Sequence, residues 1–463
     1  MARLAAAGSP LTDAGFAQEC GAAAGGTSAS WGIASAAPQG QHPPMSTTAP
    51  LPVSERIAVL DILRGFALMG ILIMNMPGFS SSFFAEADGS HLWPGRLDQL
   101  AEELRDMLFS GKFNSMFSLL FGIGFTIQYR RMQERLGDGA TALYLRRLIV
   151  LFVFGVVHAC VFWPGDVLHM YAILGLVLML PLRRVGDRGV MVLIGACLLY
   201  PAVSGVLRVL LMTPDVVARR VADAKAMEAL DNLAYGQGSF IDMVAQNTRT
   251  MAFGLRDGWA LWGELGSFVM FGLTMLIGAL AGRRRWAERI PELMPQIRRA
   301  TVWALVLGLG CGALFTLIFH FNRVPGPSPI KVLGSVAYWV SRVAMMVFYV
   351  LVIVRLAQRP GPQRWLAAMG IAGRMPLTNY LMQTAICLVI FKHWGLGLWM
   401  QVGPAAGLVL ALAIFFVIQV PWSRWWLARH ERGPLEALWA WLTYGRTAAG
   451  AEGAPAGGTV QRR

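Results

Sequence analysis

Apolar runs of about twenty residues alternate with short polar stretches along most of this chain. A bilayer is crossed by about 20 apolar helical residues, so each run predicts a membrane-spanning helix. The fourth and ninth runs are short, and we expect a partly re-entrant piece at 365–374 before the ninth. The pattern predicts an all-α, polytopic membrane helix bundle of about ten transmembrane helices, near 57–79, 113–129, 145–163, 167–182, 189–211, 262–282, 300–320, 333–356, 375–393 and 403–426.

Arginines occur in every second loop between these runs. Short basic loops remain in the cytoplasm, so these loops predict the cytoplasmic face. An even number of helices then places both chain ends on that face (N-in and C-in), and the long loop near 212–261 on the other. The basic loops contain Arg130, Arg131, Arg135, Arg146, Arg147, Arg183, Arg184, Arg188, Arg283, Arg284, Arg285, Arg289, Arg298, Arg299, Arg355, Arg359, Arg364 and Arg374.

Composition agrees with a membrane location. Of the 463 residues, 56% are hydrophobic and 14% are charged, against about 25% charged in soluble domains. The net charge of +14 is carried largely by these loops rather than by one basic patch, so we expect no nucleic-acid partner. The five cysteines are far apart and show no Cys-x-x-Cys or Cys/His spacing. We therefore predict neither a disulfide framework nor a metal site.

The two ends of the chain lack apolar runs. Residues 1–50 are rich in Ala, Gly, Ser and Pro, without the continuous apolar segment of a secretory signal. We expect a disordered leader there; alternatively, translation starts at Met45 and the leader is mis-assigned. Residues 51–446 are then a single polytopic membrane domain, and 447–463 a disordered tail.

The stretch GVVHACVFWPGDVLHMY places polar residues inside an otherwise apolar helical hairpin. His158 lies near the end of the third predicted helix, and Asp166 stands at the start of the fourth, beyond a Trp-Pro-Gly turn. The short turn predicts that the two side chains are close. A carboxylate–imidazole pair is the minimal unit of a general base, so both are candidate catalytic residues. Alternatively, Asp166 caps a helix and His158 is a hydrogen-bonded core residue.

The first two predicted helices carry polar residues, which are costly within a bilayer. Asp61 and Arg64 are three positions apart and share a helix face. Arg64 either pairs with Asp61 or binds an anion, such as phosphate, that enters from the cytoplasm. Gly65 permits a close helix approach, and Asn75 follows on the same helix. Lys112, at the outer end of the second helix, either extends to the membrane surface or contacts a substrate.

The ninth predicted helix carries an amide-rich stripe. Arg374 precedes Pro376, a residue typical of a first helical turn. Asn379 and Gln383 are one turn apart on the same face. These amides either hydrogen-bond to neighbouring helices or, together with Arg374, contact a substrate or cofactor. Asp61 and Asn75 of the first helix are further candidates for such a contact. The chain contains no phosphate-binding loop, serine-hydrolase motif, zinc-protease motif or dinucleotide-binding motif.

Five segments of the chain resemble the successive signatures of the YeiB family: LDILRGFALMGILIMN, KFNSMFSLLFGIGF, GVVHACVFWPGDVLHMYAILGL, GRMPLTNYLMQTAICLVIFKHWGLGL and RGPLEALWAWLTYG. These are multi-pass proteins of the bacterial inner (plasma) membrane, classed as domain of unknown function DUF418. The resemblance extends from about Arg56 to Arg446, with the family's signature region at about 235–440. It implies the same location for this chain.

The family is similar, more remotely, to transmembrane acyltransferases. That similarity implies transfer of an acyl group from a cytoplasmic acyl-CoA to an extracytoplasmic hydroxyl or amine. In the sugar O-acyltransferases of that group, a basic residue of the first helix is followed, after ten intervening residues, by a histidine. Here Arg64 is followed at that spacing by Asn75. A catalytic histidine must then come from the third helix, where His158 is the best candidate.

Three functions are compatible with these observations. The first is an acyltransferase, with acyl-CoA as co-substrate near Arg64, and with His158 oriented by Asp166. The second is a transporter or exporter of a small metabolite, and the third is a non-catalytic membrane scaffold. The expected partners are the lipid bilayer and an unidentified small molecule, with a homo-oligomer left open. For the first function, one pocket should connect Arg64 with His158.

Overall fold

The computed structural model describes residues 58–256, 258–358 and 363–445. Every regular element in these ranges is a helix, which confirms the predicted all-α, polytopic helix bundle. The predicted leader at 1–50 and tail at 447–463 lie outside the described residues.

All ten predicted spans coincide with helical segments. Helices suit a bilayer because they satisfy their own backbone hydrogen bonds. Three of the segments contain a π-helical stretch (η2, η3 and η5). The segments are α1 (Ala58–Ser80), α3 (Lys112–Leu136), α4 (Gly139–Val157) with η2 (His158–Phe162), α5 (Leu168–Leu174) with η3 (Gly175–Met179) and α6 (Leu180–Leu182), α7 (Asp187–Leu211), α10 (Gly258–Arg283), α11 (Ile290–Phe321), α12 (Pro329–Ala357), α14 (Pro376–Phe391), and α15 (Pro404–Ala413) with η5 (Ile414–Gln419) and α16 (Val420–Leu427).

Seven helical segments in the described ranges are long and apolar enough to cross a membrane, and two shorter apolar ones lie at Leu168–Leu182 and Pro376–Phe391. Several of the long helices expose large apolar side chains. Val192 and Leu210 of α7 are each 72% exposed, and Trp303 of α11 is 67% exposed. Such wide apolar surfaces are unfavourable in water and suit contact with lipid. The chain is therefore a polytopic membrane protein.

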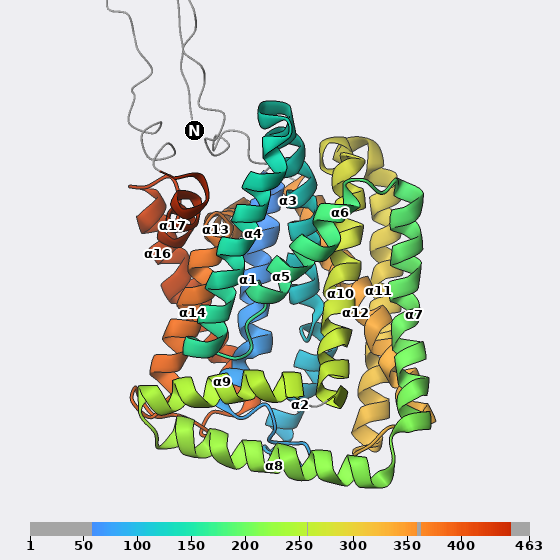
Figure 1. Cartoon of the computed structure of the whole chain (residues 1–463), viewed down its shortest axis with the longest axis vertical. Helices are drawn as coiled ribbons and strands as arrows, with labels where there is room; N and C mark the ends of the chain where they lie inside the picture. Colours follow the sequence, from blue (N-terminus) through green and yellow to red (C-terminus); the bar gives the residue numbers. More distant parts are fainter. Residues whose placement is uncertain (1–57, 257, 359–362, 446–463) are drawn as a thin grey trace, which may run out of the picture. The chain divides into compact units, whose positions relative to one another are not determined.

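Consecutive spans run in opposite directions, so the predicted arginine-rich loops gather at one end of the bundle (Figure 1). We call this the arginine-rich end. It also holds the short helices α13 (Gln363–Gly373) and α17 (Pro434–Tyr444). The long loop predicted near 212–261 is largely helical, as α8 (Pro214–Gly236) and α9 (Phe240–Arg256), and crosses the opposite end (Figure 1). Pro214 at the first turn and the Thr213 hydroxyl, 3.5 Å from the Val216 N–H, favour the start of α8.

Helix α1 lies in the interior of the bundle. Ala67, Leu68 and Leu72 have no exposed surface. The piece predicted at 365–374 is helix α13, which packs along α1. A Cβ atom added to Gly65 would lie 1.8 Å from the Met369 carbonyl oxygen, so the predicted close approach at Gly65 is confirmed.

Candidate functional site

The turn between η2 and α5 brings three polar side chains together. His158 Nδ1 lies 2.8 Å from Asp166 Oδ1, and His169 Nδ1 lies 2.8 Å from Asp166 Oδ2. The His169 backbone N–H also donates to Asp166 Oδ2 at 3.0 Å. The hairpin is tight, since a Cβ on Gly155 would lie 2.2 Å from His169 N. The short turn therefore brings the acid and the imidazole close together, as predicted, and Asp166 also accepts a backbone N–H from the first turn of α5.

Helix α14 closes this cluster from the other side. His158 Nε2 lies 2.9 Å from Thr384 Oγ1, and the Tyr380 hydroxyl donates to Asp166 Oδ1 at 3.4 Å. His158 is 2% exposed and Asp166 is 3% exposed. If Nδ1 carries the proton that Asp166 accepts, Nε2 carries no proton and can accept one, as a general base requires. In this arrangement its partner is the Thr384 hydroxyl.

The amide stripe of α14 connects helices. The Asn379 side-chain amide donates to the Ala372 carbonyl and to Ser423 Oγ, both at 2.9 Å. The Gln383 amide donates to the Leu68 carbonyl at 3.1 Å and to Gln419 Oε1 at 3.0 Å. Asn379 and Gln383 therefore hydrogen-bond to neighbouring helices, which is one of the two roles predicted for them.

Lys112 and Asn75 have different surroundings. Lys112 has no exposed surface, and its ammonium donates to the Asp106 carbonyl at 2.6 Å. Gly111, with a φ of 75°, lies in the turn between helix α2 (Arg96–Leu108) and α3. Lys112 follows this turn, and its ammonium contacts the last turn of α2. Lys112 therefore does not extend to the surface as a lysine at a membrane edge often does. Asn75 is half-buried on α1.

A cavity of about 340 Å³ opens at the arginine-rich end, and we call it the arginine cavity. It brings together Asp61, Arg64 and Arg374, three residues predicted to bind substrate or cofactor. Helices α3 and α4 supply apolar walls, including Phe117, Phe121 and Leu148. The six arginines of its lining are Arg64, Arg131, Arg135, Arg147, Arg374 and Arg432.

The two acidic residues of the arginine cavity are both engaged. Asp61 Oδ1 accepts a hydrogen bond from Arg64 Nη1 at 2.6 Å, so the predicted ion pair forms beside the cavity. Glu436 of α17 accepts the backbone N–H groups of Leu377 and Thr378 at 2.7 and 3.1 Å. It thereby caps the first turn of α14. The lining keeps an excess of positive charge.

The arginine side chains are held by different partners. The Arg147 guanidinium stacks over the Trp439 ring at 3.7 Å from its centroid. Arg374 Nη2 donates to the Glu431 carbonyl at 3.4 Å. The Arg64 side chain remains 26% exposed. Arginine and phosphate geometries are complementary, so this lining can bind a phosphorylated group.

The catalytic candidates and the arginine cavity are separate. Arg147 of α4 lines the cavity, and His158 lies eleven positions further along the same helix, about 16 Å away at 1.5 Å per residue. His158 and Asp166 are absent from the linings of this cavity and of two others at the opposite end. The single pocket expected to connect Arg64 with His158 is not among these three.

The cavities at the opposite end contain residues that the sequence did not single out. One has a volume of about 220 Å³ and lies beside Ile73 and Met76 of α1. The other, about 360 Å³, contains His91. Glu86 and Glu102 line both. These three residues follow no recognised ligand spacing, so no sequence signal marks them.

Comparisons with known proteins place the chain among uncharacterised relatives. A family model described as "Protein of unknown function (DUF418)" matches residues 281–446. The chain is 29% identical over 415 residues to the uncharacterized protein YxaH of Bacillus subtilis, covering 86% of this chain and 97% of that protein. It is 27% identical over 418 residues to the uncharacterized protein YeiB of Escherichia coli, covering 84% and 96%. No solved structure matches.

Proposed function

We infer that this chain is a YeiB-like member of the DUF418 family, as its sequence motifs predicted. We propose that its arginine cavity binds the phosphate groups of an amphiphile of the acyl-CoA class. The observation that carries the proposal is a lining with six arginines beside apolar walls. A phosphorylated headgroup is recognised by guanidinium groups, and a hydrocarbon or pantetheine chain suits the apolar residues. The volume of about 340 Å³ is within the usual range for small-molecule sites, about 300–1,000 Å³.

The cavity's place in the bundle supports a cytoplasmic ligand. It opens at the end where the arginine-rich loops gather. Under the positive-inside rule this end faces the cytoplasm, and the resemblance to the YeiB family implies the bacterial inner membrane. Acyl-CoA is the ligand implied by the resemblance to transmembrane acyltransferases. Part of the lining, including Arg374, Arg432 and Trp439, belongs to the segment matched by the family.

Acyl transfer is the reaction that we propose to follow from this binding. His158 Nε2 would accept the proton of an acceptor hydroxyl or amine. The acceptor atom would bond to the acyl carbon, the carbon–sulfur bond would break, and the coenzyme A thiolate would take the proton from His158. The pantetheine arm is an extended chain between the phosphates and the thioester. An arm that enters the bundle along α4 would have to span the separation of about 16 Å between Arg147 and His158.

Binding is tested first, with the full chain purified in lipid nanodiscs and titrated with labelled acetyl-CoA. Arg64→Gln and Arg374→Gln should each weaken binding by about tenfold or more, because each removes a charge-assisted hydrogen-bond donor. Arg298→Gln is the matched control, since Arg298 is an exposed arginine near the start of α11, at the same end. Binding should persist in this control. No binding at millimolar acetyl-CoA, or an equal loss in the control, would refute the proposal.

Export of a small metabolite is the second candidate. One observation favours it: α1 lines cavities at both of its ends, through Arg64 in one and Ile73 and Met76 in the other. Transporters give alternating access from the two sides of the membrane to a site between helices. Proteoliposomes loaded with labelled acetyl-CoA and an external acceptor separate the two functions. Labelled acyl product indicates transfer, whereas unmodified label outside indicates transport.

A further inference from the structure

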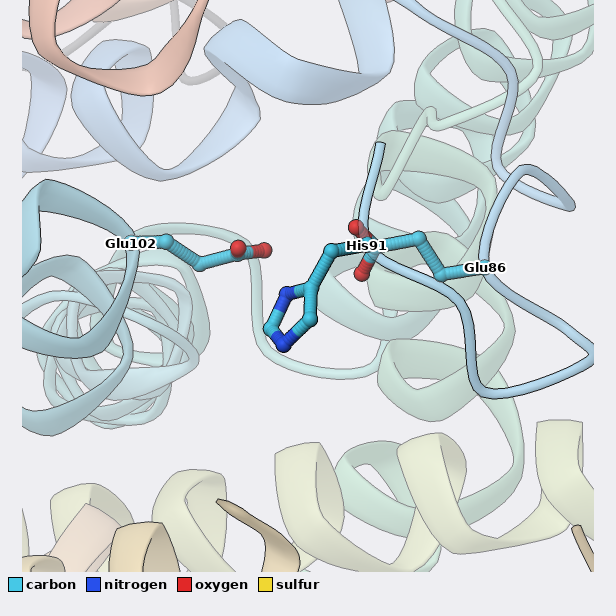
Figure 2. A group of neighbouring side chains, drawn as sticks. All are labelled: Glu86, His91 and Glu102. Atoms are coloured by element: carbon cyan, nitrogen blue, oxygen red, sulfur yellow. The ribbon is translucent and has the colours of Figure 1, made fainter. Parts of the chain in front are cut away.

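Three potential metal ligands converge at the end of the bundle opposite the arginine cavity. Glu86 and His91 lie in the segment that follows α1, and Glu102 lies on α2. Figure 2 shows the Glu102 side chain reaching toward His91 from one side and Glu86 approaching from the other. One ligand atom from each residue can be chosen so that all three lie within 4.8 Å of one another. Two separate segments of the chain thus bring their potential metal-binding atoms close together.

The donor types suit a divalent transition metal. Zinc binds imidazole nitrogen and carboxylate oxygen at about 2.0–2.2 Å in tetrahedral geometry, so two ligand atoms on one ion are about 3.4 Å apart. A spacing within 4.8 Å therefore requires the side chains to move together by at most about 1.4 Å. Mg²⁺ and Ca²⁺ prefer oxygen ligands alone, whereas imidazole favours Zn²⁺ and its neighbours.

The imidazole of His91 provides a second, independent observation. Its Nδ1 atom is shielded from solvent and has no hydrogen-bond partner among the described residues. A buried polar atom without a partner is unfavourable by about 1–3 kcal/mol, so native proteins rarely retain one. A metal ion bonded to this nitrogen would satisfy it.

Neighbouring groups orient the two carboxylates. Glu86 Oε1 accepts the Leu92 backbone N–H at 2.8 Å, which holds the loop between Glu86 and His91 in place. Arg105 Nη2 lies 3.4 Å from Glu102 Oε1 but is closer to Asp106 Oδ1, at 2.9 Å. Burial and the charge of Glu86 raise the pKa of the Glu102 carboxyl. A cation would relieve this repulsion.

We propose that Glu86, His91 and Glu102 form a binding site for a divalent transition-metal ion such as Zn²⁺. Three protein ligands leave at least one coordination position for water or another small ligand. Because Glu86 and Glu102 line the two neighbouring cavities, the ion is reached from both. The bound ion fastens the segment after α1 to helix α2. The site is independent of the arginine cavity and of acyl-CoA binding.

The test uses the full chain without a histidine tag, stripped of metal by a chelator and titrated with Zn²⁺ by calorimetry. The variants are Glu86→Gln, His91→Gln and Glu102→Gln. Glu103→Gln and His320→Gln are matched controls, because these two residues line the same cavity but pair with each other at 2.8 Å. We expect one Zn²⁺ per wild-type chain, at least tenfold weaker binding in each ligand variant, and wild-type affinity in both controls.

Several results would overturn the metal site. These are no Zn²⁺ binding by the wild type, unchanged affinity in the ligand variants, or equal weakening in the controls. The wild type alone gives a second test that needs no variant to fold. A ligand that binds only the folded state raises the unfolding temperature, so Zn²⁺ should raise that of the wild type while Mg²⁺ at the same concentration should not. Equal effects of the two ions would contradict the proposed donor chemistry.

Discussion

His158 Nε2 lies 2.9 Å from the Thr384 hydroxyl, although the two residues are 226 positions apart. The opposite side of the ring is held by Asp166, whose other carboxylate oxygen accepts from His169. The imidazole is thus fixed at both nitrogens, with a hydroxyl at the one that a general base would use. An acceptor alcohol would have to take the place of Thr384 as the partner of Nε2.

His158→Ala should separate binding from chemistry. Because His158 is absent from the lining of the arginine cavity, labelled acetyl-CoA should bind the variant as it binds the wild type. Acyl transfer should fall by about a hundredfold or more, the usual contribution of a general base. Both quantities are measured on one preparation, binding by titration and transfer by labelled product.

The control for His158 is His169→Ala, which removes the other imidazole on Asp166. The His169 side chain is 16% exposed, and its ring bonds only the Oδ2 side of the carboxylate. Its loss should reduce transfer much less. If both variants transfer acyl groups at the wild-type rate, the cluster is structural and His158 is a hydrogen-bonded core histidine.

Gly65→Ala should destabilise the bundle. The added Cβ would lie 1.8 Å from the Met369 carbonyl oxygen, a backbone atom that cannot move without shifting α13. Overpacking of this kind typically lowers the free energy of unfolding by about 1–3 kcal/mol. The change is measured as a lower unfolding temperature in detergent. Gly195→Ala on α7, where nothing lies within 4 Å of the added atom, should keep the wild-type temperature.

Gln383→Leu should weaken the contact of α14 with its neighbours. The substitution removes the hydrogen bonds to the Leu68 carbonyl and to Gln419. Hydrogen bonds between membrane helices contribute about 0.6 kcal/mol on average and up to about 1.7 kcal/mol. Thermal unfolding should therefore shift to lower temperature while acetyl-CoA binding persists. A loss of binding with unchanged unfolding would instead place Gln383 in a ligand site.

Glu436 should make stability depend on pH. Burial raises the pKa of the Glu436 carboxyl above its ordinary value of 4.5, despite its hydrogen bonds from Thr378 and Leu377. The folded chain then binds this proton more tightly than the unfolded chain. The contribution of this group to the free energy of unfolding is therefore greatest below pH 4.5, and it declines as the pH rises through the raised pKa.

The isosteric variant Glu436→Gln isolates this effect. When the pH is lowered from 7.5 to 5, the unfolding temperature of the wild type should rise relative to that of the variant. The measurement is a pair of thermal unfolding series in the same detergent. Parallel pH profiles for the two chains would show that Glu436 has no raised pKa in the folded state.

Most of the fold could be predicted from local sequence. Apolar runs long enough for a bilayer locate helices, because hydropathy is a property of contiguous residues. Even the short fourth and ninth runs correspond to helices, at Leu168–Leu182 and Pro376–Phe391. The helical form of the segment near 212–261 was not predicted, since α8 and α9 cross one end of the bundle and lack a long apolar run.

The candidate sites were predictable only where their residues are close in the chain. Asp61 and Arg64 form a pair because three positions bring them to one helix face. A short turn likewise brings Asp166 to His158. Thr384, by contrast, reaches His158 only because α14 packs against η2. No local pattern carries that information.

The sequence by itself determined the helices, their alternating direction and the arginine-rich end, and it carries the motifs that resemble the YeiB family. These depend on composition and spacing within short segments. Only the tertiary structure decided that Arg64, Arg147 and Arg374 share one cavity, and that Glu86, His91 and Glu102 meet at the other end. Such groups arise from packing between distant helices, where side-chain shape and buried hydrogen bonds select one arrangement among many.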